Sequence, residues 1–235
     1  MSFDKLSLRL ARSLEELDTT SNKMNGYLSY ATWTPTEKSI GSFKASWRVP
    51  LAPKKKGHQT LFLFMGMETA DRTLIFQPVL EWGPSPGAAK EESHWSVACY
   101  LVNGSPGNLS LGAKTKSVPV SVCDLLEAEI SLNSTADGLF GYSCEFKEIV
   151  GCGLYIQSPL KFTQAGVALE VSNVSDTAAL PASTLTQFEN LEIVLDDGSK
   201  SAPDWQITNL AAQYGVRAYP IDHRGIKDEI DIQYR

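Results

Sequence analysis

The chain has 235 residues, 43% of them hydrophobic, which is enough to bury the core of one full domain. Its formal net charge of −6 at pH 7 argues against nucleic acid or an anionic membrane as a partner. The densest apolar run, residues 61–65, is far too short to cross a bilayer.

The first residues predict an amphipathic helix. Apolar side chains recur at three- and four-residue steps, at Phe3, Leu6, Leu10, Leu14 and Leu17, and Asp4 can cap the start. We therefore expect a helical extension over residues 1–24 and one main domain over residues 25–235. The extension either packs on the domain, or acts as a plug or a dimer contact.

Localisation signals point in two directions. The N-terminal residues lack the uninterrupted apolar core of a signal peptide, which favours the cytoplasm. Four N-x-Ser/Thr motifs, at Asn103, Asn108, Asn133 and Asn173, favour a secreted protein whose leader was removed. Four cysteines, Cys99, Cys123, Cys144 and Cys152, allow three disulfide pairings; without a leader, free thiols are expected.

The remainder of the chain reads as short β-strands. Runs typical of strands cover residues 41–49, 60–67, 73–82, 93–102, 118–123, 126–132, 140–146, 154–156, 165–171, 191–195 and 229–234, with a short helical segment over 209–214. Turn sequences rich in Gly, Pro, Asn and Asp separate many of these runs. Many short strands without intervening helices predict an all-β sandwich or barrel.

Two of these strands carry polar groups on apolar surfaces. Alternation places Ile75, Gln77, Val79 and Glu81 on one face of their strand, opposite a face of Leu and Phe residues. In the second strand, Glu170 shares a face with Ala168. A buried amide or carboxylate is costly without a partner, so each is either satisfied by a structural neighbour or functional.

Other chemistries have little support in the sequence. The three histidines, His58, His94 and His223, are scattered, and neither H-E-x-x-H nor paired C-x-x-C motifs occur. The G-x-S-x-G turn of serine hydrolases is also missing. We expect no metal and no cofactor. A pair of carboxylates of the glycosidase type would involve Glu81, but the acidic neighbourhood of such sites is lacking.

Three motifs in order resemble the fungal glutamic peptidases, or eqolisins. They are Ser46-Trp47-Arg48-Val49-Pro50, then Ile75-Phe76-Gln77 with Glu81-Trp82, then Ala165 five residues before Glu170. The similarity extends thinly from about Asn25 to Arg235. It implies a concanavalin A-like jelly-roll sandwich of two antiparallel sheets.

The resemblance also implies a mechanism. Glu170 would act as general base on a water molecule and return the proton to the leaving amine, while the amide of Gln77 would stabilise the oxyanion. In the family this chemistry runs at acid pH. Substrate-binding or supporting positions would be Glu81, Trp82, Glu68, Phe64, Trp95 and Trp47.

Several substrate-binding positions differ from the family pattern. A Trp and an Asp of the family correspond to Phe64 and Glu68 here, an acidic residue to Val97, and the early Asn-Trp-Gly-Gly to Asn25-Gly26-Tyr27. The expected function is an acid-type endopeptidase with a peptide substrate. Two alternatives remain: an intracellular biosynthetic enzyme that uses the same pair on a small molecule, and a non-catalytic module that binds carbohydrate or peptide.

Overall fold

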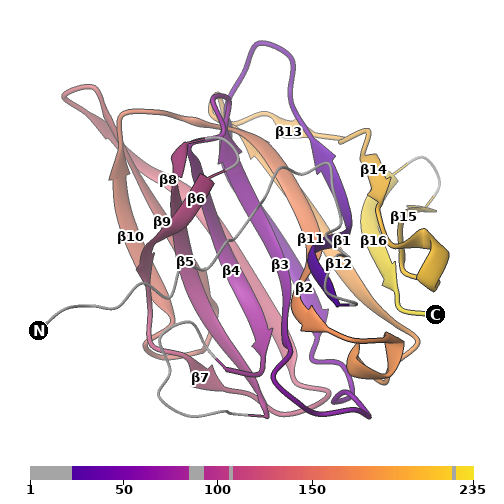
Figure 1. The fold of residues 1–235 in the computed structure, drawn as a ribbon. Helices are drawn as coiled ribbons and strands as arrows, with labels where there is room; N and C mark the ends of the chain where they lie inside the picture. Colours follow the sequence, from indigo (N-terminus) through magenta and orange to yellow (C-terminus); the bar gives the residue numbers. More distant parts are fainter. Residues whose placement is uncertain (1–22, 85–92, 106–107, 224–225) are drawn as a thin grey trace, which may run out of the picture.

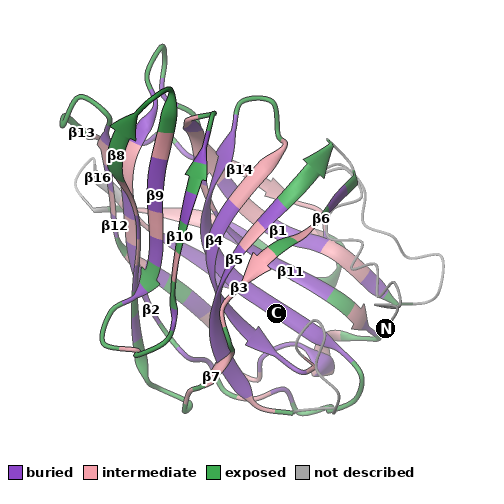
Figure 2. Ribbon diagram, turned by 90° about the vertical axis from the view of Figure 1, so that its left-hand side faces the viewer, coloured by how far each residue is buried: buried purple, intermediate pink, exposed green. Residues whose placement is uncertain are grey.

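The computed structural model describes residues 23–84, 93–105, 108–223 and 226–235. Two antiparallel sheets pack face to face around the main hydrophobic core (Figures 1 and 2), which confirms the predicted all-β sandwich. The predicted helix over residues 3–17 lies outside the described residues. Within the described ranges, no helix has the length and apolar character needed to span a membrane.

The first sheet carries the central strands of the candidate site. Its order is β14 (Gln206–Asn209), β1 (Met24–Trp33), β11 (Phe162–Val174), β3 (Thr60–Thr69), β4 (Leu74–Trp82), β5 (Trp95–Ser105) and β6 (Asn108–Lys114), with β7 (Val118–Pro119) beside β5. β3 therefore separates β4 from β11, which lies far along the chain.

The second sheet closes the other side of the core. Its order is β10 (Gly153–Ser158), β9 (Leu139–Phe146), β8 (Leu125–Ala136), β2 (Ile40–Arg48), β12 (Leu185–Leu195), β16 (Ile226–Gln233) and β15 (Arg217–His223), with β13 (Lys200–Ser201) beside β12. Two 3-10 turns, η1 (Thr177–Ala179) and η2 (Ala212–Tyr214), lie in the connections.

Aromatic side chains join the two sheets. Phe162 of β11 meets Tyr142 of β9 edge-on at 4.8 Å between ring centroids, and stacks with Phe76 of β4 at 6.2 Å. The backbone N–H of Phe162 also donates to the Tyr142 hydroxyl. All three rings are fully buried, so they fix how the sheets face each other.

Two predicted elements differ from the structure. Residues 118–123 were expected as one strand, but only Val118–Pro119 pairs; the chain then turns, with Cys123 at φ 71° and Asp124 N–H donating to Ser121. The helical segment expected over 209–214 is only the 3-10 turn η2. Strands β1, β6 and β15 were not assigned in advance.

The first sheet has a second apolar cluster on the side turned away from the second sheet, which we call the outer face. Its buried members are Tyr27, Phe62, Phe64, Val79, Ala98, Tyr100, Val102, Leu109 and Ala168. Strand alternation separates these residues from the interior core, and Figure 2 shows the central strands β3 and β4 as mostly buried. The polar groups predicted to be functional lie on this same face.

Candidate active site

The predicted site residues divide between the outer face of the first sheet and the core between the two sheets. Gln77 and Glu81 alternate with interior residues of β4, and Glu170 does so on β11, as the sequence predicted. Phe64 and Glu68 lie on the same outer face of β3. The tryptophans Trp47, Trp82 and Trp95 instead belong to the interior core between the sheets.

Hydrogen-bond register sorts the outer face into rows of directly opposed residues. The Gln77 row contains Gly166, Gly66, Gln77, Tyr100 and Lys114. The Glu170 row contains Tyr27, Glu170, Phe62, Glu81 and Ser96. Gln77 and Glu170 thus lie two strands apart on one face, in rows separated by four residues along each strand.

Gln77 lies over a stretch of the sheet without side chains. Gly66 of β3 lies beside it, and a Cβ atom added at Gly66 would lie 3.2 Å from the Gln77 Cβ and 3.7 Å from the Gln77 Oε1. Gly66 is itself opposite Gly166. Gln77 is only 4% exposed, and its Oε1 has no hydrogen-bond partner among the described residues. A buried, unsatisfied amide oxygen is uncommon in a folded protein and marks Gln77 as a candidate functional group.

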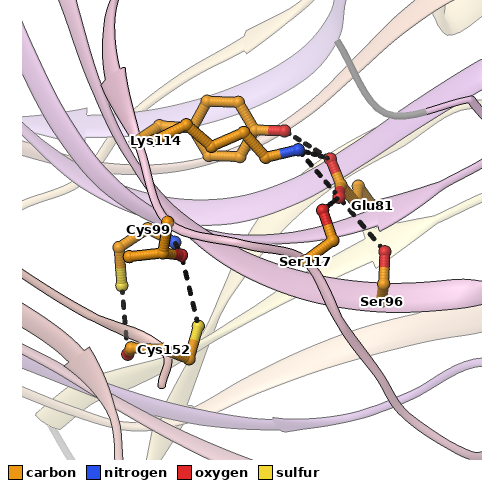
Figure 3. A network of polar contacts seen from close by, with 8 residues as sticks. Glu81, Ser96, Cys99, Lys114, Ser117 and Cys152 are labelled. Atoms are coloured by element: carbon orange, nitrogen blue, oxygen red, sulfur yellow. Dashed lines mark hydrogen bonds and ion pairs between the residues drawn. The ribbon is translucent and has the colours of Figure 1, made fainter. Parts of the chain in front are cut away.

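Glu81 is the centre of a buried polar network (Figure 3). Its carboxylate accepts hydrogen bonds from Ser96 at 3.1 Å, from Ser117 and from the Tyr100 hydroxyl. The Lys114 ammonium lies 3.1 Å and 3.2 Å from the two carboxylate oxygens and 4.8 Å from the centre of the Tyr100 ring. Glu81 is fully buried, so these partners supply the compensation that a buried charge requires.

This ion pair shows how far side chains reach between the two rows. Lys114 belongs to the Gln77 row and Glu81 to the Glu170 row, with one strand between them. Gln77 and Glu170 are related by the same diagonal, with β3 between them. Gln77 and Glu170 are thus separated by the same number of strands and residues as Lys114 and Glu81.

Glu68 lies one step beyond the Gln77 row, opposite Ile75 and Gln164. It is 9% exposed. Burial raises the pKa of its carboxyl from 4.5 to about 7, against the opposing effect of Arg72 and with a smaller rise from Asp71. Near neutral pH, Glu68 can therefore either hold or release a proton.

The raised pKa of Glu68 predicts a pH-dependent stability. Between pH 4.5 and about 7 the folded protein holds a proton that the unfolded chain has lost, so the free energy of unfolding falls as pH rises. The loss is about 3 kcal/mol at most, and Glu68→Gln should remove it. Urea denaturation of both proteins at several pH values from 4 to 8 measures the free energy of unfolding. If this free energy changes with pH in the same way for both proteins, the raised pKa of Glu68 is contradicted.

Three residues of the outer face were not identified as functional candidates from the sequence: Tyr27, Tyr100 and Lys114. Lys114 ends the edge strand β6, beyond a bulge that disturbs the alternation. Tyr100 is an aromatic residue in a predicted strand, and no sequence motif around it indicated a function. Tyr27 had been noted only as part of the altered Asn25-Gly26-Tyr27 segment.

All four cysteines are free thiols. Cys99 lies on the interior side of β5, where its Sγ donates to the carbonyl of Cys152 at 3.5 Å (Figure 3). Hydrogen bonds with Cys144 and burial both raise the pKa of the Cys99 thiol. A thiol with a raised pKa is a poor nucleophile, so this cluster is typical of a packed core.

Among the described residues, no group of three or more His, Cys, Asp or Glu side chains is arranged to hold a metal ion. The outer face carries carboxyl, amide and phenol groups, besides the Lys114 ammonium and serine hydroxyls. These are groups for acid–base catalysis and for hydrogen bonding to a carbonyl oxygen.

The fold is similar to three solved structures. A scytalido-glutamic peptidase with a peptide-based transition state analog matches with a TM-score of 0.57 at 14% identity, over 90% of this chain and 98% of the other. The same enzyme with a transition state analog inhibitor gives 0.55 at 16% identity, with the same coverage. SCP-B, an eqolisin-family peptidase with the tripeptide Ala-Ile-His, gives 0.55 at 13%, again over 90% and 98%.

No protein-family model and no curated protein sequence matches the chain. At identities of 13–16%, the similarity to the solved structures establishes a shared fold. It spans 98% of each peptidase chain.

Proposed function

We propose that this protein is a hydrolase of the glutamic-peptidase type that cleaves amide bonds of peptides or peptide-like molecules. Glu170 accepts a proton from the attacking water, and the Gln77 side-chain N–H donates to the carbonyl oxygen as it gains charge. The C–N bond then breaks, and Glu170 passes its proton to the leaving nitrogen. The similar folds are those of peptidases bound to transition state analogs and to a peptide.

The diagonal relation between Gln77 and Glu170 carries this proposal. On the equivalent diagonal, Lys114 and Glu81 touch at 3.1 Å, so the two rows approach closely enough for side chains to act together. The two glycines beside Gln77 keep that part of the face free of side chains.

A second candidate is an enzyme that uses the same groups on a small molecule. Gln77, Glu170 and Glu68 are only 4–9% exposed and lie among apolar side chains. Such surroundings suit a compact, mostly apolar substrate better than an extended polar peptide.

The test of amide hydrolysis is incorporation of oxygen from water. An unfolded protein is incubated with the purified chain in ¹⁸O-labelled water from pH 2 to 7, with pepstatin present, and the products are analysed by mass spectrometry. We expect new carboxyl termini that carry ¹⁸O. A folded protein that generates no such termini at any pH would contradict the peptidase proposal and favour the small-molecule enzyme.

A further inference from the structure

Tyr27 extends from the Glu170 row toward the glycines beside Gln77. It pairs directly with Glu170, and the β1 strand has register shifts on both sides of it, between Met24 and Gly26 and between Tyr27 and Ser29. Such bulges rotate a strand and re-aim its side chains, often next to active sites. Here the bulge lets Tyr27 join Tyr30 on the outer face although they are three positions apart, an odd spacing that would otherwise put them on opposite faces.

The position of the Tyr27 ring follows from its aromatic neighbours. It meets Tyr30 edge-on at 5.6 Å and Phe64 at 6.2 Å between ring centroids. Tyr30 and Phe64 are the two residues opposite Ala168, on either side of β11. The ring therefore lies over Ala168, whose small side chain leaves room for it, one step from Gly166 in the Gln77 row.

The surroundings of Tyr27 keep its hydroxyl protonated. Burial, Glu170 and then Glu68 raise the pKa of this phenol well above 10. The hydroxyl therefore keeps its proton and can act as an uncharged hydrogen-bond donor.

We propose that Tyr27 is a second oxyanion donor, whose hydroxyl donates to the same carbonyl oxygen as the Gln77 amide. This inference rests on the proposed function, because it assigns Tyr27 to the reaction of Glu170 and Gln77. Two neutral donors directed at one oxygen stabilise the negative charge that develops there, and neither loses its proton as pH changes. Gly66 and Gly166 contribute no side chains of their own beside Gln77, and the side chains of Gln77 and Thr32 border the place where that oxygen would lie.

Tyr27→Phe tests the role of the hydroxyl while keeping the ring. On a peptide cleaved in the ¹⁸O assay, we expect kcat to fall about 100-fold with KM nearly unchanged, since the donor acts only as the oxyanion forms. The control is Tyr155→Phe, a half-exposed tyrosine of the second sheet, which should leave kcat as it is. Equal kcat values for wild type and Tyr27→Phe would overturn the inference.

A binding measurement separates this inference from the proposed function. 4-Nitrophenol is titrated against the full chain at pH 8, where bound phenolate, a stable oxyanion, is read by its visible absorbance. We expect Tyr27→Phe and Gln77→Ala each to weaken binding at least tenfold, with unchanged near-UV circular dichroism. Equal binding by Tyr27→Phe, or no binding by wild type at millimolar concentrations, would overturn the Tyr27 role whatever the ¹⁸O assay shows. Tight, Tyr27-dependent binding without peptide cleavage would leave the donor in place and contradict only the peptidase proposal.

Discussion

Glu170→Gln is expected to lower kcat for amide hydrolysis by about 10³-fold, the usual contribution of a positioned general base. The substitution keeps the size of the side chain but removes its ability to take a proton from water. Gln77→Ala should cost about 10²–10³-fold, because one oxyanion donor is lost. Both effects should be seen in kcat rather than in KM, since both groups act on charge that develops in the transition state.

The control for this experiment is Glu127→Gln, an exposed glutamate on β8 of the second sheet, which should keep full activity. All four proteins should share one melting temperature within a few degrees. If Glu170→Gln retains wild-type kcat while remaining folded, the acid–base assignment is wrong, even for a protein that passes the ¹⁸O assay.

Lys114→Met is expected to destabilise the fold by about 3 kcal/mol or more, the range for a buried ion pair that loses one partner. Methionine keeps the length of the side chain but removes the Lys114 ammonium from the fully buried Glu81 carboxylate. Adding Glu81→Leu should recover part of the loss, because no buried charge then remains. Urea denaturation gives the free energy of each variant.

Lys200→Met provides a matched comparison for the same measurement. Lys200 also forms a short ion pair, with Glu192, but the two side chains are 75% and 40% exposed. An exposed pair contributes about 0–1 kcal/mol. A Lys114→Met protein that is no less stable than Lys200→Met would show that the Glu81 network does not depend on its cation.

The face of each site residue could be read from the sequence, because strand alternation has a period of two. Gln77, Glu81 and Glu170 each lie on the side that their neighbours predicted. β1 escaped assignment because its two bulges break that period. The same irregularity concealed Tyr27, whose side chain would be placed on the wrong face by simple counting past Ser29.

The rows could not be predicted, because they depend on which strands pair and in what register. Nothing in the local sequence states that Glu81 lies opposite Phe62, or that Lys114 lies opposite Tyr100. The tryptophans illustrate the same limit. Motif resemblance suggested a role at the site for Trp47, Trp82 and Trp95, whereas packing between the sheets accounts for their positions.

The strand order has a consequence for how the protein folds. β11 pairs with both β1 and β3, and β12 pairs with β2. Strands synthesised early therefore lack their pairing partners until much later parts of the chain have been made. Sheets built from such distant pairings fold slowly, on a scale of milliseconds to seconds. β3 and β4 can form a hairpin on their own, but Glu170 joins Gln77 only when β11 inserts. During synthesis, Gln77 and Glu170 therefore share the outer face only once the first sheet is nearly complete.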